Sequence, residues 1–202
     1  MSENICECQT FETRPYINGK YLVCGAALCG GAAYAILNKF FSEYAYEITG
    51  IKKPQYDIMN IMAERAYSKE RSLKTYTTFG GTRNDPGKRG AISEISESNF
   101  TPDQLIVSFF EGMAYELYDL YVQMNLKKKY VVASGNAVRK NLVFQKILRD
   151  IYNMPIDMPE YREEAAFGAA LYAMVCIGKD TNYIKEMVKY KTIENQNGEP
   201  EL

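Results

Sequence analysis

"YLVCGAALCGGAAYAIL" spans residues 21–37 without one charged side chain, and its interpretation decides the fold. It admits three readings: a membrane span, a glycine loop that cradles phosphate, or the buried interior of a soluble sheet. A spanning helix needs about 20 predominantly apolar residues, which exceeds this stretch, and polar Asn38 and Lys39 follow it directly. Its first half is a strand-like apolar run, Gly30 and Gly31 punctuate it, and its second half has helical spacing. We therefore expect a strand, a tight turn and a helix.

The rest of the chain alternates in the same way. A strand is expected over residues 10–17, joined to the opening strand by a tight turn at Asn18-Gly19. Further helices are expected over residues 54–69, from Pro102 onward, over 139–153 and over 163–178, and strands over 129–133 and 154–159. Such alternation indicates an α/β domain with a mixed sheet. We expect this domain to cover residues 1–192 and the polar tail, residues 193–202, to be disordered.

One helix start is marked in detail by "NFTPDQL". Thr101 is expected as the N-cap, Pro102 as the first helical residue and Gln104 as the partner that completes a capping box. Phe100 and Leu105 are spaced for a hydrophobic staple. Apolar residues then recur at intervals of four, which predicts a helix with a packed face.

Composition narrows the function classes. The chain has 24 basic and 25 acidic residues, a balance that argues against nucleic-acid binding, which needs clustered cations. It has no histidine, which excludes histidine-based triads, general bases and metal ligands. Its five cysteines are an odd count, and the first residues lack a basic, apolar leader, so we expect a reduced, cytoplasmic protein. Cys6 and Cys8 alone are too few ligands for a zinc site.

Two glycine turns follow strand-like runs, at Gly30-Gly31 and at residues 134–136. Ligands of α/β sheets bind where strands end in such turns. Neither turn matches the dinucleotide fingerprint or the spacing of the P-loop. The alternative, that each glycine only supplies a positive φ or close packing, agrees with the pattern equally well.

Several motifs become recognisable together. They are GAALCGGAAYAIL (25–37), FGGTRNDPGKRGAI (79–92), NFTPDQLIVSFFEGMAYEL (99–117) and SGNAVRKN (134–141), followed by EEAAFGAALYA (163–173). In this order they resemble the C-terminal lobe of the FGGY carbohydrate kinases, within the actin-like ATPase superfamily, and most closely sedoheptulokinases. The resemblance covers roughly residues 12–190. The third and fourth motifs are the specific ones, because other members of the family carry different residues there. The last motif is shared across the family and says less about the substrate.

The resemblance implies a fold and an activity. The fold would be the actin-like (ribonuclease H-like) C-terminal lobe, a mixed sheet flanked by helices, here apparently lacking its first strand. The activity would be transfer of the γ-phosphoryl group of ATP, with Mg²⁺, to a sugar hydroxyl, which depends on positioning and electrostatics rather than on histidine. Sedoheptulose is the preferred substrate, ahead of xylulose, ribulose or glycerol.

The resemblance also implies a nucleotide site. Gly30 and Gly31 would lie along the nucleotide, with Gly31 close to the adenosine. Ser134, Gly135 and Asn136 would contribute to the adenine pocket, and Asn136 and Asn141 would offer amide hydrogen bonds to the purine or ribose. Ala137 stands where related kinases carry a second glycine, and a positive φ there would cost about 1 kcal/mol.

The motif FGGTRNDPGKRGAI (79–92) leaves two alternatives for the role of Arg83. Arg83 and Asp85 could pair and brace a loop that faces the cleft, or Arg83 could meet a phosphate as a planar fork. Bracing is the preferred interpretation. The pair Gly80-Gly81 replaces a single glycine of the family, so a shift of register is possible there.

The family's N-terminal lobe, its Asp general base and its sugar contacts have no counterpart in this sequence, so no residue is assigned as catalytic or as a metal ligand. The first hypothesis is the nucleotide-binding part of a sugar kinase, inactive until a separately encoded N-terminal lobe supplies the remainder. The second is a non-catalytic nucleotide-binding or interaction module derived from such a kinase. A third is a fragment without independent function, which exposed edge strands and aggregation would support. ATP or ADP is the expected ligand under the first two hypotheses. Neither nucleic acid nor a membrane is an expected partner under any of the three.

Overall fold

The computed structural model describes residues 11–16, 19–125 and 130–193. The expected disordered tail falls outside this range apart from Ile193, and so do Cys6, Cys8 and the Asn18 half of the predicted turn. By its contacts the chain divides into two compact units, Met1–Lys127 and Lys128–Leu202.

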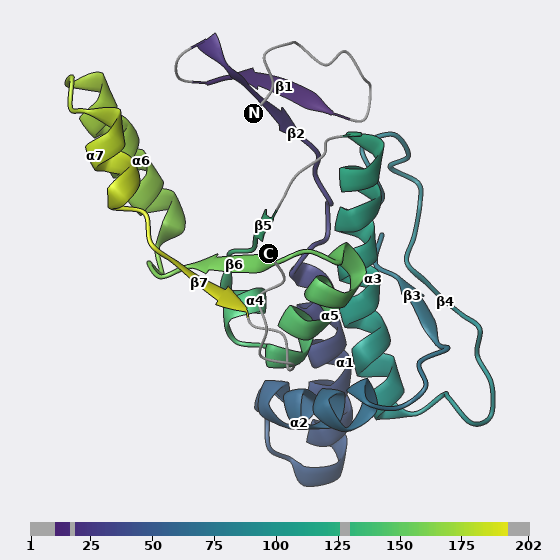
Figure 1. Cartoon of the computed structure of the whole chain (residues 1–202). Helices are drawn as coiled ribbons and strands as arrows, with labels where there is room; N and C mark the ends of the chain where they lie inside the picture. The colour runs from purple at the N-terminus through teal and green to yellow at the C-terminus, as the bar shows by residue number, and fades with distance from the viewer. Residues whose placement is uncertain (1–10, 17–18, 126–129, 194–202) are drawn as a thin grey trace. The chain divides into compact units, whose positions relative to one another are not determined.

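The described residues of the first unit form two hairpins and three helices (Figure 1). Strands β1 (Glu12–Pro15) and β2 (Tyr21–Cys24) pair antiparallel, as expected, with Glu12 opposite Cys24. The other elements are α1 (Ala32–Thr49), α2 (Tyr56–Tyr67), β3 (Lys74–Tyr76), β4 (Ala91–Ser93) and α3 (Pro102–Gln123), with β3 and β4 paired antiparallel. The predicted strand, turn and helix of the opening stretch are therefore β2, the glycine turn and α1. Among the described residues no helix has the length and apolarity to cross a membrane.

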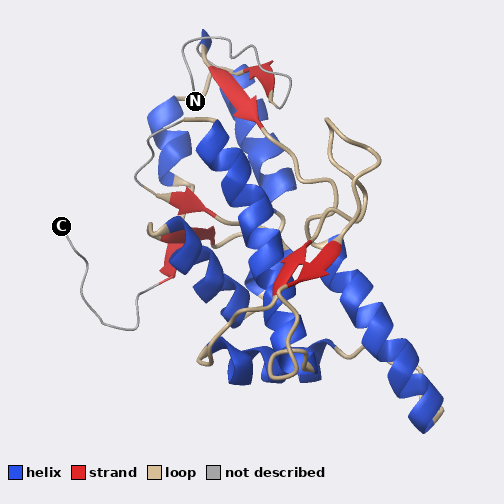
Figure 2. Cartoon of the chain, turned by 90° about the vertical axis from the view of Figure 1, so that its right-hand side faces the viewer, coloured by secondary structure: helices blue, strands red, loops and turns tan. Residues whose placement is uncertain are grey.

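Helix α3 is the centre of this unit. It packs against α1, α2 and β3, and the β3–β4 hairpin lies alongside it (Figure 2). Its side chains Ile106, Val107 and Phe110 are almost completely buried. Of the residues predicted at intervals of four, Phe109 and Met113 are buried, but Leu117 is 39% exposed. The Phe110 ring lies 4.7 Å from that of Tyr34 in α1, whose hydroxyl donates to Asn60 Oδ1 of α2 at 2.7 Å. Burial of one such aromatic side chain stabilises a fold by roughly 1.5–3 kcal/mol, so α3 joins the two helices into one core.

The start of α3 corrects one local prediction. Pro102 is the first helical residue, as expected, but the Thr101 side chain makes no capping bond to the backbone. Its hydroxyl donates to Asp103 Oδ1 at 2.5 Å, and that carboxylate accepts from the Gln104 backbone N–H at 3.0 Å. The Gln104 amide instead donates to the Glu70 carbonyl oxygen, so the capping box is absent. Phe100, the predicted staple residue, is 58% exposed.

The second unit holds the mixed sheet that the alternation predicted. Strand β5 (Val131–Val132) pairs parallel with β6 (Ile156–Pro159), and β6 pairs antiparallel with β7 (Tyr190–Ile193). Between them lie α4 (Asn136–Arg139), α5 (Leu142–Tyr152), α6 (Glu164–Cys176) and α7 (Thr181–Glu186). Helix α5 buries one face, with Val143, Phe144, Ile147 and Leu148, and ends at Asn153 in the left-handed conformation that favours asparagine at helix ends.

Helix α6 covers Glu164–Cys176, within the helix predicted over residues 163–178. None of its residues is buried, although nearly all of them are apolar. At its N-terminus Phe167 stacks on Tyr161 with ring centroids 3.8 Å apart, and the helix also contacts α7.

Candidate nucleotide-binding turns and a threonine-lined cavity

The first glycine turn leads from the loop after β2 into α1. Gly30 has a φ of +43°, and the backbone N–H of Ala33 donates to its carbonyl oxygen at 3.1 Å. Gly31 has an ordinary φ of −60° and is the N-cap of the helix. The left-handed conformation that favours glycine is therefore at Gly30, while Gly31 stands at the positive end of an 18-residue helix dipole. The first N–H groups of the helix are already used in the turn, since the Ala32 N–H donates to the Cys29 carbonyl oxygen at 2.8 Å.

The second glycine turn follows β5. Gly135 has a φ of +95° and a ψ of 163°, a conformation that is essentially restricted to glycine. No heavy atom lies within 4 Å of the position that a Cβ would occupy, so backbone shape and not crowding requires glycine here. Ser134, Gly135 and Asn136 are all exposed. These three residues can therefore be reached by a ligand.

Two residues of the same motif take other roles than the sequence suggested. Asn141 is 4% exposed and is the N-cap of α5, where its side-chain oxygen accepts from the Phe144 N–H at 3.4 Å. Its side-chain oxygen is thus used in capping the helix, and its predicted contact with a nucleotide stays a prediction. Ala137 lies inside α4 and is not among the residues with positive φ, so the expected penalty for replacing a glycine does not arise.

A charged cluster that the sequence analysis missed lies directly behind the second turn. The Arg139 guanidinium donates from Nε and Nη2 to Glu164 Oε1, at 2.9 and 2.6 Å. The same Nη2 reaches the carbonyl oxygens of Pro159 and Tyr161. The hydrogen bond from Arg139 lowers the pKa of the Glu164 carboxyl. The available signal in the sequence was the glutamate at the start of the last motif.

The predicted pairing of Arg83 with Asp85 in the second motif is wrong, because Arg83 has a different partner. Arg83 forms an ion pair with Glu12 of β1, whose pKa is lowered by hydrogen bonds from Arg14 and from Arg83. Asp85 instead accepts from the backbone N–H groups of Gly87 and Lys88, at 3.0 and 3.1 Å. Arg83 therefore braces the loop, as preferred, but against the β1–β2 hairpin.

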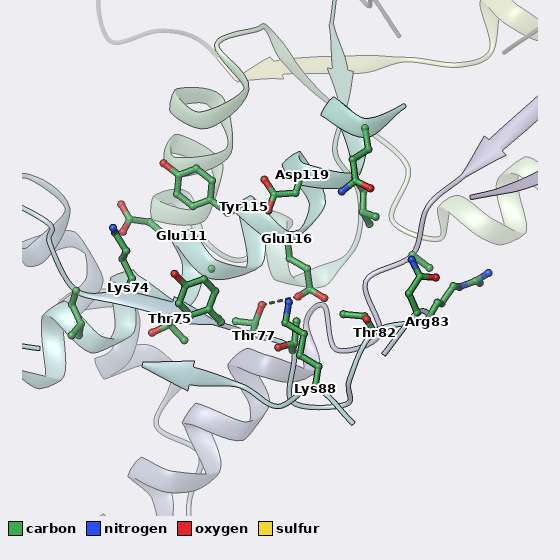
Figure 3. Close-up of a pocket in the computed structure, with 18 residues that line it drawn as sticks. Lys74, Thr75, Thr77, Thr82, Arg83, Lys88, Glu111, Tyr115, Glu116 and Asp119 are labelled. Atoms are coloured by element: carbon green, nitrogen blue, oxygen red, sulfur yellow. Dashed lines mark hydrogen bonds between the residues drawn. The ribbon is translucent and has the colours of Figure 1, made fainter. Parts of the chain in front are cut away.

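The first unit also contains a cavity of about 500 Å³ that no sequence pattern indicated. Threonines of β3 and the segment after it form one wall, and carboxylates of α3 form the other (Figure 3). Thr77 Oγ1 donates to Glu116 Oε2 at 2.7 Å, and this hydrogen bond joins the two walls. The lining includes Lys74, Thr75, Thr77, Thr78, Thr82, Arg83, Lys88, Glu111, Glu116 and Asp119. The sequence could not reveal it, because its walls lie about 40 residues apart along the chain, as the 39-residue separation of Thr77 and Glu116 shows.

The predicted site residues belong to different units. Gly30, Gly31, Arg83 and Asp85 are in the first unit, and Ser134, Gly135, Asn136 and Asn141 are in the second. Within the described part of the chain, no group of three or more His, Cys, Asp or Glu side chains is arranged to hold a metal ion. We therefore derive no step through a metal held by this chain; Mg²⁺ commonly binds through nucleotide phosphates and water.

Comparison with known proteins decides the family. The family model described as the C-terminal domain of the FGGY family of carbohydrate kinases matches residues 10–177, most of the chain. The chain belongs to this family. Both glycine turns, the Arg83 loop and the Arg139–Glu164 cluster lie within the matched region of this FGGY chain.

Individual relatives are glycerol kinases. The chain is 33% identical over 116 residues to the glycerol kinase of Parabacteroides distasonis, which is 54% of this chain and 23% of that protein. It is 30% identical over 98 residues to the glycerol kinase of Bacillus subtilis, covering 46% and 19% of the two proteins. The matched region thus spans about a quarter or less of these curated relatives.

Solved structures agree on the fold. The FGGY chain superposes on xylulose kinase from Rhodospirillum rubrum with a TM-score of 0.73 at 19% identity, over 96% of this chain and 38% of that one. It superposes on Plasmodium falciparum glycerol kinase with ADP with a TM-score of 0.69 at 21% identity, over 92% and 38%. The predicted fold class, the C-terminal lobe of an actin-like ATPase with a mixed sheet flanked by helices, is confirmed.

Proposed function

We propose that this chain is the nucleotide-binding part of a cytoplasmic, ATP-dependent sugar kinase that transfers the γ-phosphoryl group of ATP to a sugar hydroxyl. The observation that carries the proposal is the turn at Gly135 within a chain of the FGGY family. A backbone conformation restricted to glycine there leaves open space beside three exposed residues at the end of a sheet strand. Ligands of α/β sheets bind at such strand ends.

The chain's own groups define what it would do in the reaction. Ser134, Gly135 and Asn136 would bind the base and ribose through a peptide that a ligand can approach without meeting a Cβ. ATP, with Mg²⁺, supplies the phosphoryl group. No side chain of this chain is assigned the removal of the hydroxyl proton, so a partner lobe with a carboxylate base is part of the proposal.

We further propose sedoheptulose as the sugar. The support is limited to the two specific motifs, residues 99–117 and 134–141, which resemble those of sedoheptulokinases. The chain is similar to glycerol and xylulose kinases, so glycerol and xylulose are the main alternative substrates. A substrate panel of sedoheptulose, xylulose, ribulose and glycerol decides between them once activity has been reconstituted.

Binding of ADP–Mg²⁺ to the purified chain, measured by titration calorimetry, tests the nucleotide site. We expect saturable binding that the Gly135→Asp variant abolishes, because a side chain would enter the open space and strain the turn. Gly178→Asp is the matched control: Gly178 also has positive φ, lies in the same unit and has no heavy atom within 4 Å of its Cβ position. Absence of binding by the folded chain, or equal loss in both variants, would contradict the assignment.

The second candidate function is a nucleotide-binding or interaction module without phosphoryl transfer. Mixing the chain with a separately expressed FGGY N-terminal lobe discriminates the two. Sugar-dependent release of ADP by the mixture supports the kinase. A stable complex that binds nucleotide but releases no ADP supports the module.

A further inference from the structure

Helix α1 extends well beyond the core of its unit. Its buried side chains, Ala33, Tyr34 and Leu37, all belong to its first two turns. None of the remaining helical residues, 38–49, is buried. At a rise of about 1.5 Å per residue, these residues form a helical extension roughly 18 Å long that no described part of the chain encloses.

The extension has a poor sequence for an unsupported helix. Residues 40–49 read FFSEYAYEIT, in which aromatic, β-branched and hydroxyl-bearing residues outnumber the strong helix formers. Isolated helices shorter than about 12–15 residues are marginal in water even when their sequences are favourable. Because packing of an apolar face supplies most helical stability in proteins, the extension indicates a surface that a partner covers.

An exposed apolar stripe follows the extension. Ile36, Phe40, Tyr44 and Ile48 recur at intervals of four and are between 45% and 67% exposed, and Ile51, just past the helix, is 60% exposed. Since a large side chain presents about 200 Å² in full, these five expose roughly 600 Å². This is the upper end of the range for the largest apolar patch on a monomer, so the stripe has the size of an interaction surface.

The stripe is large enough to pair with a second copy of the chain. Two copies that cover each other's stripe would bury roughly 1,200 Å², more than the ~1,000 Å² that a specific interface needs. In a two-fold arrangement the same patch serves both sides. Antiparallel packing centred on Tyr44 would set Phe40 of one copy opposite Ile48 of the other.

Charged residues along one edge of the stripe favour this arrangement. Lys39, Glu43 and Glu47 also recur at intervals of four, and Lys39 pairs with Glu43 in its own helix at 3.7 Å. Lys39 and Glu47 are two turns apart, about 12 Å, so they do not meet within one helix. In the antiparallel pair the same edge of each helix meets in reverse direction, which brings Lys39 of each copy near Glu47 of the other. The edge is therefore complementary to itself, and such complementarity fixes register and partner choice.

We propose that the stripe from Ile36 to Ile51 is the interface of an antiparallel, two-fold symmetric dimer of this chain. Alternating charges along its edge select a second copy over a lipid surface, which would require an excess of Lys and Arg beside the apolar face. The proposal goes beyond the proposed function and does not depend on the nucleotide site, because it gives the chain a partner that binds through other residues.

Sedimentation velocity of the full chain, over protein concentrations of about 1–100 μM, tests the dimer. We expect the wild-type chain to dimerise and Tyr44→Glu to raise the dissociation constant by more than about tenfold, because central aromatic residues carry most of the binding energy of an interface. Tyr183→Glu is the matched control: Tyr183 lies in α7 and is 55% exposed, and its substitution should change the constant by less than about twofold. Circular dichroism verifies that both variants are folded.

A charge exchange tests the antiparallel arrangement. Lys39→Glu and Glu47→Lys each place like charges opposite one another in a homodimer, so each should weaken dimerisation about tenfold. An equimolar mixture of the two variants restores both pairs of opposite charges in the heterodimer and should dimerise about as tightly as wild type. Repair within one helix does not explain this rescue, because each copy in the mixture keeps its single substitution.

Three results would overturn the proposal. A folded wild-type chain that stays monomeric excludes the dimer, and binding of that monomer to phosphatidylcholine–phosphatidylglycerol vesicles would assign the stripe to a membrane instead. A dimer that Tyr44→Glu does not weaken has its interface elsewhere. A mixture that dimerises no better than Lys39→Glu or Glu47→Lys alone excludes the antiparallel packing.

Discussion

Gly112 of α3 lies so close to the Thr75 carbonyl oxygen of β3 that a Cβ at Gly112 would overlap that oxygen. This contact sets the distance between the central helix and the β3–β4 hairpin, and it places the α3 carboxylates opposite the threonines of the cavity. The glycine within the motif NFTPDQLIVSFFEGMAYEL is therefore required by packing and not by backbone conformation, since it lies inside a regular helix.

Substitution of this glycine should be costly. We expect Gly112→Ala to lower the free energy of unfolding by about 1–3 kcal/mol, because the helix and the hairpin must move apart. Gly168→Ala in α6 is the control: no heavy atom lies within 4 Å of its Cβ position, and alanine is favoured in a helix by up to about 1 kcal/mol. Urea unfolding of both variants checks the prediction, and equal effects would show that the close contact is not maintained in solution.

The two glycines before Thr82 should respond differently. Gly81 has a φ of +79°, and a Cβ there would lie 2.6 Å from the Pro86 carbonyl oxygen, whereas Gly80 has only Leu28 at 3.9 Å. We expect Gly81→Ala to lower the free energy of unfolding by more than about 1 kcal/mol and Gly80→Ala to change it by less than about 0.5 kcal/mol. Thermal unfolding measures both. The opposite order would mean that the family's single glycine corresponds to Gly80.

Asp103 should make the stability depend on acid pH. Burial raises the pKa of its carboxyl, but hydrogen bonds from Thr101, Lys69 and the Gln104 N–H outweigh burial and lower it from 3.8 to about 2. Because the folded pKa lies below the unfolded one, the stabilisation is complete above about pH 4 and is lost as the pH falls toward 2. After allowance for solvent screening at the exposed Lys69, it amounts to about 1–2 kcal/mol.

Asp103→Asn tests this dependence. The variant should be less stable than wild type at neutral pH, and the difference should shrink between about pH 4 and pH 2 in urea unfolding. Asp57→Asn is the control, because Asp57 also lies in the first turn of a helix but is exposed. A difference that stays constant with pH would show that Asp103 acts only through the shape of its side chain.

The cavity wall depends on one buried hydroxyl. Thr77 is 1% exposed and donates to Glu116, so Thr77→Val leaves the carboxylate without this donor while it keeps the volume of the side chain. We expect a loss of about 1–3 kcal/mol in the free energy of unfolding. Glu116→Gln keeps an acceptor and should cost less. If the valine variant is as stable as wild type, water replaces the hydroxyl and the cavity is open to solvent.

Local elements of this protein followed from local patterns. The glycine turn before α1, the start of α3 at Pro102 and the strands β5 and β6 are where the apolar spacing and the turn residues predicted them. The errors concern side chains that had a choice of partner. Gln104 was expected to bond within its own helix end and instead bonds to the Glu70 carbonyl, and Arg83 was expected to meet Asp85 and instead meets Glu12.

By itself, then, the sequence determined the α/β alternation and the positions of the two glycine turns, because hydrophobic period and turn chemistry act over a few neighbouring residues. The family was indicated by the resemblance of its motifs, and the family model over residues 10–177 confirms it. Only the tertiary structure decided which polar groups meet. Arg83 and Glu12 are 71 residues apart and Arg139 and Glu164 are 25 apart, and the Gly112–Thr75 contact brings together two elements with no shared pattern. Such partners are chosen by the packing of whole helices and hairpins, so a charged residue's sequence neighbours do not reveal them.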